Sequence, residues 1–365
     1  MSQIPQLLQR WRGFSLFPLV ILLVAVSHGW GQIRVEDQRG QLITLPNPAE
    51  RVVTIPIPTA SIVMALDGSS RRIVGMHPAA RQSIQEGFLR RVFPEALSIQ
   101  ADVTRGGMFT PNLESILALR PDLIVQWTEP ADVIRVLEEA RLTVVGLIND
   151  PPTQEIHERN LAIVGEVIGQ RERVARLVRS QREVRQQVEA AVAAIPESDK
   201  PRVLYFRTLR QRMAPAGRHT YQNFWIHLAG GTNVAAFTGM NTAVNVEQIV
   251  AWNPQVMFIG SFDDATPDDI MRHPALAAVD AVRQRRVYKL PHGGYRWDPG
   301  SHESHLTWQW AAMLLHPERI RFDLRQAMRD TYTFLYRYEL TDAETNDILQ
   351  APMNGSMTGY ATLIR

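Results

Sequence analysis

The 365-residue sequence contains no cysteine. The chain can therefore form no disulfide bond, and its stability must come from the size of its hydrophobic core. A bacterial lipoprotein is excluded as well, because lipid attachment requires a cysteine directly after the apolar part of the leader. If the chain is exported, we expect it to be released rather than lipid-anchored.

A strong excess of either charge is also missing. The chain has 39 Lys and Arg against 37 Asp and Glu, a net charge of +2. Its arginines are spread along the sequence rather than gathered in a basic block, which argues against a nucleic-acid partner. With 21% charged and 45% hydrophobic residues, the composition is that of a globular protein.

No apolar run is long enough to cross a bilayer, which takes roughly 20 residues. The longest is "GFSLFPLVILLVAV" at 13–26, preceded by Arg10 and Arg12 and followed by the small residues of "SHGWGQ". This order predicts a signal peptide over 1–31, cleaved near Gly29 or Gly31, and hence a soluble periplasmic protein. A permanent membrane anchor is the alternative interpretation.

The rest of the chain alternates between short apolar strands and amphipathic helices. After a hairpin predicted around "DQRG", strands such as "RVVTI", "RRIVGM" and "DLIVQW" are separated by helical segments. The same alternation restarts at "RVLYF". Short connections between alternating strands and helices favour a parallel sheet covered by helices, and here they favour two of them.

Between these two regions lies a segment with a helical pattern and a single apolar face, which predicts one long connecting helix. After the second region, two further helices are expected, with Asp323 and Thr341 as their N-caps, followed by a loose tail. The predicted division is a signal peptide over 1–31, an N-terminal lobe over 32–153, the long helix over 154–195, a C-terminal lobe over 196–318, and a C-terminal helical extension and tail over 319–365.

One repeat is explicit. "NLESILALRPDLIVQW" at 112–127 and "NVEQIVAWNPQVMFIG" at 245–260 align without a gap, and each predicts a helix, a proline-marked turn and a strand. Each copy also lies at an equivalent place in its half, after a strand that begins "RVV" or "RVL". The sequence therefore predicts two similar α/β lobes.

This repeat, together with "RVVTIPIPTASIVMALDG", the long helix and "GGTNV", resembles the periplasmic substrate-binding proteins of bacterial ABC importers. The similar branch serves ferric siderophores, vitamin B12 and haem, and is related to metal- and molybdate-binding members. The resemblance, which covers about residues 34–318, implies an α/β fold of two Rossmann-like lobes with parallel sheets. One long, rigid α-helix would join the lobes, and a ligand would lie in the cleft between them.

The resemblance also implies a partner, a dimeric inner-membrane ABC permease. Glu114 and Glu247 occupy the repeat positions at which this family docks one lobe on each permease subunit through permease arginines. The alternative is that each carboxylate only favours the dipole of its helix from the first turn.

Ligands of α/β sheets bind outside the carboxyl ends of the strands, which directs attention to the loops there. Aromatic side chains in these loops are predicted as pocket walls and arginines as contacts for an anionic ligand, although a packed ring or a solvated charge is the alternative for each. One departure from the family is Ser61, near where many relatives carry Glu. The predicted ligand-binding residues are Thr59, Phe109, Trp127, Arg207, Arg210, Tyr295, Trp297 and His302.

The segment "HGGYRWDPGSHESHLTWQW" at 292–310 is rich in histidine and tryptophan. His302 and His305 are three residues apart, so they do not form the HExxH motif of zinc proteases. We therefore predict no resident metal or other cofactor, and a metal that arrives inside the ligand. Convergence of His77, His302 and His305 on zinc is the alternative. Trp310 is expected in the core.

The predicted function is capture of a small-molecule metal complex, first of all a ferric-siderophore-like chelate, by a monomeric binding protein without catalytic residues. Alternative ligands are a molybdate-type oxyanion, haem or a corrinoid. An exported metal-dependent enzyme that uses the His-rich loop is a more distant alternative, opposed by the lack of a nucleophile motif.

Overall fold

The computed structural model describes residues 32–106, 109–239 and 242–364. The predicted signal peptide and its cleavage site lie outside these residues. Within the described part of the chain, no helix combines the length and the apolar character needed to cross a membrane.

A four-stranded parallel sheet forms the centre of the first lobe. Its strands lie in the order β4-β3-β7-β8, in agreement with the predicted parallel sheet. Their bounds are β3 Val52–Thr54, β4 Ile73–Met76, β7 Leu123–Trp127 and β8 Val144–Leu147. The helices of this lobe are α1 Thr59–Asp67, α2 Pro78–Glu86, α3 Leu89–Val92, α4 Leu113–Leu119 and α5 Asp132–Glu139. The predicted hairpin is present as β1 Ile33–Glu36 and β2 Leu42–Leu45, and a smaller one as β5 Thr104–Arg105 and β6 Thr110–Pro111.

The second lobe repeats this topology. Its strands β11, β9, β12 and β13 are parallel and lie in that order, which matches the order of the first sheet strand for strand, while β10 pairs antiparallel with the end of β9. The strands are β9 Arg202–Thr208, β10 Ala214–Pro215, β11 Thr232–Asn233, β12 Val256–Ile259 and β13 Val287–Lys289. The helices are α8 Tyr221–Leu228, α9 Val246–Trp252, α10 Pro267–Met271, α11 Asp280–Arg283 and α12 Ser304–Leu315.

The sequence repeat has the same conformation in both lobes. Helix α4 ends at Arg120 and helix α9 at Asn253, both in the left-handed conformation, with φ of 46° and 41°. A proline follows in each copy, and then strand β7 or β12. The predicted helix–turn–strand unit is therefore confirmed in both lobes.

The segment over 154–195 is not one helix, so this prediction was wrong. It forms α6 Gln154–Val167 and α7 Arg171–Ala193, separated at Gly169, which has a φ of 73°. Glycine adopts this conformation without steric cost, and the turn lets the chain fold back on itself. A Cβ on Gly165 would lie 2.5 Å from Val174 Cγ1, so the two helices approach closely where a side chain is missing.

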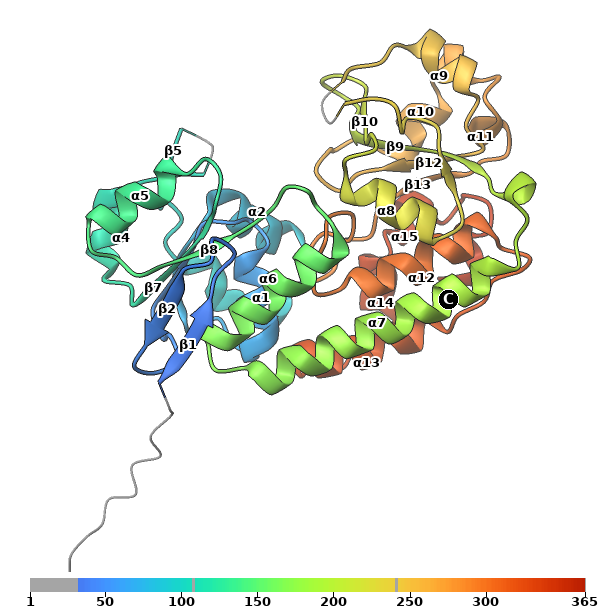
Figure 1. Cartoon of the computed structure of the whole chain (residues 1–365). Helices are drawn as coiled ribbons and strands as arrows, with labels where there is room; N and C mark the ends of the chain where they lie inside the picture. Colours follow the sequence, from blue (N-terminus) through green and yellow to red (C-terminus); the bar gives the residue numbers. More distant parts are fainter. Residues whose placement is uncertain (1–31, 107–108, 240–241, 365) are drawn as a thin grey trace, which may run out of the picture. The chain divides into compact units, whose positions relative to one another are not determined.

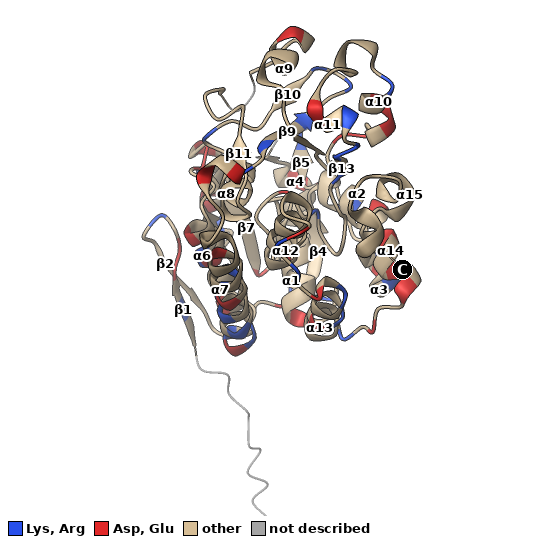
Figure 2. Cartoon of the chain, turned by 90° about the vertical axis from the view of Figure 1, so that its right-hand side faces the viewer, with Lys and Arg blue, Asp and Glu red and all other residues tan. Residues whose placement is uncertain are grey.

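Helix α7 nevertheless reaches both lobes and runs below them in Figure 1. At its start, Arg173 Nε donates to the Ala65 carbonyl of α1 over 3.3 Å. At its end, Val192 packs against Gly230, which follows α8. Acidic and basic residues are interspersed along α7 (Figure 2). One hydrophobic cluster runs through residues of both sheets, α6, α7 and α12.

The C-terminal extension comprises α13 Leu324–Tyr336, α14 Asp342–Ile348 and α15 Ala351–Asn354. Asp323 and Thr341 cap the first two helices as predicted. The expected loose tail is wrong, since Tyr360 is fully buried and its hydroxyl accepts a hydrogen bond from Trp310 Nε1 over 3.1 Å. The tail thus covers core that α12 would otherwise leave exposed.

Candidate ligand-binding site

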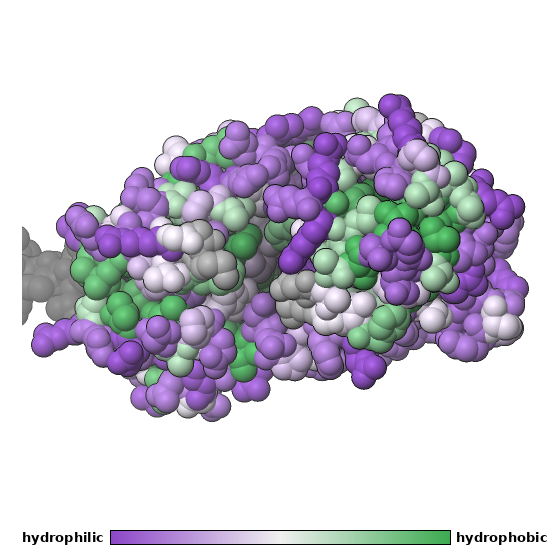
Figure 3. Space-filling model, turned by 90° about the horizontal axis from the view of Figure 1, so that it is seen from above, coloured by the Kyte–Doolittle hydropathy of each residue, from purple (hydrophilic) through white to green (hydrophobic). Residues whose placement is uncertain are grey.

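A cavity of about 660 Å³ lies where strand ends of both lobes meet. From the first lobe it is lined by the loop into α1, by Trp127 at the end of β7, and by the segment that follows β8 into α6. From the second it is lined by the end of β9, the start of α8 and the loops after β12 and β13. Viewed from above, the surface is hollowed between the lobes (Figure 3). The cavity therefore lies at the sheet edges from which the sequence predicted it.

Aromatic rings form much of the cavity wall. In the first lobe Phe109 and Trp127 meet edge to face with ring centroids 6.3 Å apart. In the second lobe Tyr221, Phe262 and Tyr295 line the opposite side. Such walls suit a ligand with apolar or delocalised surface.

Asp298 lines the cavity, but its carboxylate is already hydrogen-bonded to other residues of the protein. This buried carboxylate accepts hydrogen bonds from the Tyr205 hydroxyl over 2.5 Å, from the Ser261 hydroxyl, and from the Ser261 amide over 3.3 Å. Burial, and then the nearby carboxylate, raises the pKa of Tyr205 well above its usual range. The tyrosine therefore stays a neutral donor, and both groups brace the end of β9.

Three buried polar atoms of the described cavity-lining residues have no hydrogen-bond partner. They are Thr59 Oγ1, Trp127 Nε1 and His157 Nε2. An unpaired buried polar atom costs free energy. Burial lowers the pKa of His157 to about 4, and its imidazole is neutral at neutral pH.

Five of the predicted ligand-binding residues lie at the cavity. They are Thr59, Phe109, Trp127, Arg207 and Tyr295. Their contact with a ligand remains a prediction.

The other three are placed elsewhere. Arg210 lies on an exposed turn, where Nε is 3.0 Å from Asp264 and a terminal nitrogen 3.1 Å from Asp269. Trp297 and His302 are fully buried and do not line the cavity. The Trp308 ring, which the sequence assigned neither to the core nor to the cavity, is also fully buried.

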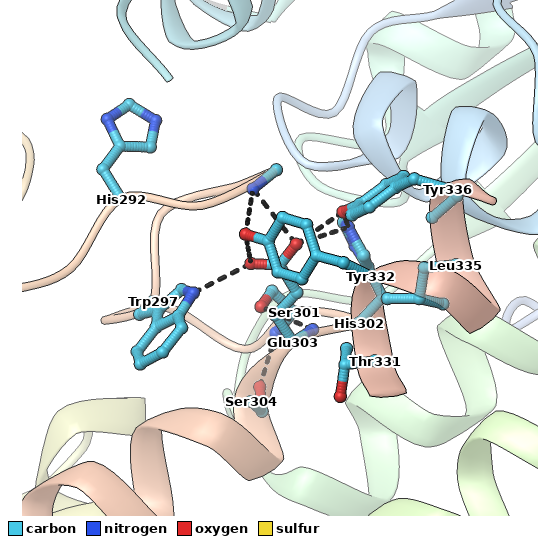
Figure 4. A network of polar contacts seen from close by, with 12 residues as sticks. His292, Trp297, Ser301, His302, Glu303, Ser304, Thr331, Tyr332, Leu335 and Tyr336 are labelled. Atoms are coloured by element: carbon cyan, nitrogen blue, oxygen red, sulfur yellow. Dashed lines mark hydrogen bonds and ion pairs between the residues drawn. The ribbon is translucent and has the colours of Figure 1, made fainter. Parts of the chain in front are cut away.

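A polar network around Glu303 explains where Trp297 and His302 point (Figure 4). The buried Glu303 carboxylate accepts from Trp297 Nε1 over 2.8 Å and from the Tyr336 hydroxyl over 2.5 Å. His302 Nε2 lies 2.7 Å from the same Tyr336 hydroxyl. Burial raises the pKa of Glu303 to about 7, although these hydrogen bonds oppose the shift. The residues thus fasten the loop after β13 to α13.

The loop after β13 also touches the first lobe directly. Arg296 forms an ion pair with Glu86 of α2 at 2.8 Å. The Phe88 amide donates to the Gly293 carbonyl over 2.9 Å. These contacts join the lobes beside the cavity, in addition to α7.

The structure does not bring the alternative zinc ligands together. His77 caps α2 and its ring lies tilted against that of Phe109, whereas His305 is buried with Nε2 2.8 Å from the Thr331 hydroxyl of α13. The described residues contain no group of three or more His, Asp or Glu side chains suited to a metal ion.

Sequence reasoning missed Tyr205, Tyr221 and the segment 147–153. The segment follows strand β8, so the strand-end rule could have found it. Nothing local distinguishes Tyr221, because its direction depends on how α8 packs against α7 and α12.

The two predicted docking carboxylates occupy equivalent sites. Glu114 lies in the first turn of α4 and Glu247 in the first turn of α9, and both are exposed. One turn further, Leu117 and Val250 are exposed as well, at 45% and 40%.

Comparison with known proteins identifies the class. A model of the periplasmic binding protein family matches residues 57–292, more than half of the chain, and the chain belongs to this family. It is thus a periplasmic binding protein of the kind that works with ABC transporters.

Individual relatives are more distant. The molybdate-binding protein MolA of Haemophilus influenzae is 24% identical over 326 residues, covering 83% of this chain and 90% of that protein. The Fe(3+) dicitrate-binding periplasmic protein FecB of Escherichia coli is 24% identical over 282 residues, covering 75% and 87%. A periplasmic solute binding protein from Veillonella parvula has a similar crystal structure, with a TM-score of 0.81 and 29% identity, covering 89% of this chain and 99% of that one.

Proposed function

We propose that this protein captures a small ferric chelate of the siderophore type in the periplasm and delivers it to a dimeric inner-membrane ABC permease. The observation that carries the proposal is the cavity of about 660 Å³ between the lobes, walled by aromatic rings with arginines among its lining. The protein acts as a monomer that binds and releases its cargo without chemical change.

The size and lining of the cavity favour a chelate over a bare ion. Its volume falls within the range of ~300–1,000 Å³ that is usual for organic ligands. A tetrahedral oxyanion would leave most of this space unfilled. Arg207 and Arg212 offer positive charge to an anionic chelate, while the rings of Trp127, Tyr221 and Tyr295 offer flat contact surface.

Symmetry supports the docking step. A permease of two like subunits presents the same surface twice, and Glu114 with Leu117 repeats in the second lobe as Glu247 with Val250. Each pair combines an exposed carboxylate with an exposed apolar side chain one helical turn away. Charge at such a surface steers the partners and sets their register.

The test is a thermal-shift screen against ferric dicitrate, ferrioxamine B, haem, cyanocobalamin, molybdate and divalent metals. A ligand at 100 times its dissociation constant adds about 2.7 kcal/mol to the free energy of unfolding. We expect a ferric chelate to raise the Tm and the divalent metals to leave it unchanged. A panel without any shift from a ferric chelate would refute the proposed cargo.

A matched pair of variants checks that binding occurs in the cavity. Arg207→Gln removes an arginine that lines it, and Arg210→Gln removes one on the exposed turn nearby. We expect the first variant to weaken chelate binding and the second to bind as the unmodified chain does. Equal effects would place the ligand elsewhere.

Molybdate is the second candidate, supported by the likeness to MolA. Arg207 and Arg212 of the lining, together with the first turn of α1, suit an oxyanion. In the same screen, stabilisation by molybdate without any by ferric chelates would favour this candidate.

A further inference from the structure

Phe262, in the loop after β12, lies at the mouth of the cavity. It lines the cavity, yet the residue is 52% exposed, which places its ring between the cavity and the solvent. A ligand in the cavity would therefore cover apolar surface that is in contact with water in the free protein. Covering such surface is favourable, so the direction of this ring affects how firmly a ligand is retained.

The backbone on both sides of Phe262 is held in place by one buried lysine. Lys289 Nζ donates to the Gly260 carbonyl over 2.9 Å and to the Ala265 carbonyl over 3.1 Å. It also donates to the carbonyl of Asp263, directly after the ring. These hydrogen bonds fix the course of the loop, but none of them involves the Phe262 side chain.

The ring itself lies against Arg296, a residue of the loop after β13. The guanidinium carbon is 4.5 Å from the centroid of the Phe262 ring, which is a cation–π contact. Arg296 Nε also donates to the Ser261 carbonyl over 3.2 Å, directly before the ring. Arg296 is only 5% exposed, and a cation–π contact is stronger when it is removed from water. The arginine therefore orients the ring.

The charge of Arg296 is balanced from the first lobe. One of its terminal nitrogens donates over 2.8 Å to Oε2 of Glu86, the last residue of α2. The other carboxylate oxygen of Glu86 accepts from Gln82 Nε2 over 2.7 Å. A nearly buried guanidinium requires a partner of opposite charge, so the ion pair keeps Arg296 in place. Through this arginine, a ring of the second lobe is connected to a helix of the first.

We propose that Arg296 is a positioning residue for cargo binding, which holds the Phe262 ring over the cavity mouth and is itself held by Glu86. The ring then covers the cargo as long as α2 lies against the loop after β13. Neither Arg296 nor Glu86 lines the cavity, so both act through the ring. This inference rests on the proposed function, because it requires a cargo in the cavity.

A first measurement needs no cargo. Para-fluorophenylalanine incorporated at position 262 reports the surroundings of the ring by fluorine NMR. We expect Arg296→Gln to move its resonance toward that of the free amino acid, and Glu86→Gln to move it in the same direction by less. An unchanged resonance in Arg296→Gln would overturn the proposal, because the ring would not depend on the arginine.

A second measurement follows the dissociation of ferric dicitrate by stopped flow. We expect Arg296→Gln to speed dissociation about fivefold, the scale of one cation–π contact. The association rate should change by less than about twofold, since most effects on affinity lie in dissociation. In the background of Phe262→Ala, Arg296→Gln should have no further effect, because the ring through which it acts is missing.

Matched variants separate positioning from a general loss of structure. Arg272→Gln removes an arginine of the second lobe that is 81% exposed, and it should release ferric dicitrate as the unmodified chain does. In Arg296→Gln the carboxylate of Glu86, which is 45% exposed, stays hydrated, so we expect the variant to fold. Thermal melting verifies this. Additive effects of Arg296→Gln and Phe262→Ala on dissociation would overturn the proposal.

The outcomes distinguish the positioning role from the proposed cargo. If ferric dicitrate does not bind and molybdate does, the ferric cargo is refuted, and the same variants are compared with molybdate as the probe. If a probe binds and Arg296→Gln does not change its dissociation, the positioning role alone is overturned. If no compound of the screen binds, the inference falls with the proposed function.

Discussion

At the scale of single residues, the Asn354 side chain makes the backbone hydrogen bonds that a further strand would make at the edge of the second sheet. It is fully buried at the edge strand β13, where its side-chain oxygen accepts from the Lys289 amide over 2.8 Å and its nitrogen donates to the Lys289 carbonyl over 2.9 Å. The sequence around it, "QAPMNG", has no strand or helix pattern strong enough to predict this role. An edge strand left open would expose unpaired backbone groups.

We expect Asn354→Ala to lower the free energy of unfolding by about 2–4 kcal/mol, because two buried backbone groups lose their partners. Chemical denaturation measures the change. Met353→Ala, at a more exposed neighbouring position, should cost less than about 1 kcal/mol. Similar losses in the two variants would contradict the role given to Asn354.

His292 provides a pH-dependent prediction at the same scale. Burial, followed by the positive charges of Arg296, Lys289 and Arg90, lowers its pKa from 6.5 to about 3. A base with a lowered folded-state pKa contributes stability that is complete above pH 6.5 and is lost as pH falls toward about 3, since the unfolded chain binds the proton first.

The free energy of unfolding of His292→Gln should therefore fall less between pH 6.5 and pH 4 than that of the unmodified chain. Denaturant titrations across this range measure the difference. His219→Gln, at an exposed position, is the control. A variant curve parallel to the original curve would argue against a buried neutral His292.

At the scale of elements, the connection between the lobes depends on the break between α6 and α7. The sequence did not predict the break because apolar residues recur at helical spacing on both sides of it. That spacing is the same whether the chain continues straight or turns back. Gly169 is the local signal, with its φ of 73°. Two helices that turn back on each other brace the lobes by packing, through Gly165 and Val174, rather than by length.

Gly169→Val should destabilise the chain by at least about 1 kcal/mol, because a β-branched residue is strained at positive φ. Gly169→Asn should cost less, since asparagine tolerates the left-handed conformation better. Thermal and chemical denaturation of both variants provide the comparison. An equal loss in the free energy of unfolding for the two variants would mean that the backbone rearranges at this turn.

At the scale of the whole molecule, the two lobes present Glu114 and Glu247 as an approximate repeat. We expect Glu114→Arg combined with Glu247→Arg to abolish uptake of the cargo by cells, because the proposed docking needs a negative charge at both positions and the variant carries a positive one. Binding of the cargo to the purified variant should be unchanged, since neither residue lines the cavity.

Uptake assays together with binding titrations test this expectation. Glu139→Arg, at another exposed helical carboxylate of the first lobe, is a matched control and should transport normally. Normal uptake by the double variant would remove the docking role from both residues.

The amino-acid sequence by itself determined the alternation of strands and helices in the two lobes, the duplicated unit and the sheet edges at which the cavity opens. These features depend on local hydrophobic periodicity, proline and glycine, which act within a few residues. Even the choice of Thr59, Trp127 and Arg207 followed from their place at strand ends.

Only the tertiary structure decided which aromatic and imidazole rings face the cavity. Trp297 turns inward because Glu303 accepts its hydrogen bond, and His302 because it lies against Tyr336 of the extension, whereas the Tyr221 ring packs against His157 at the cavity. The partners in these contacts are mostly tens of residues or more apart in the chain. Since the direction of a side chain is set by such distant partners, periodicity along the sequence does not encode it.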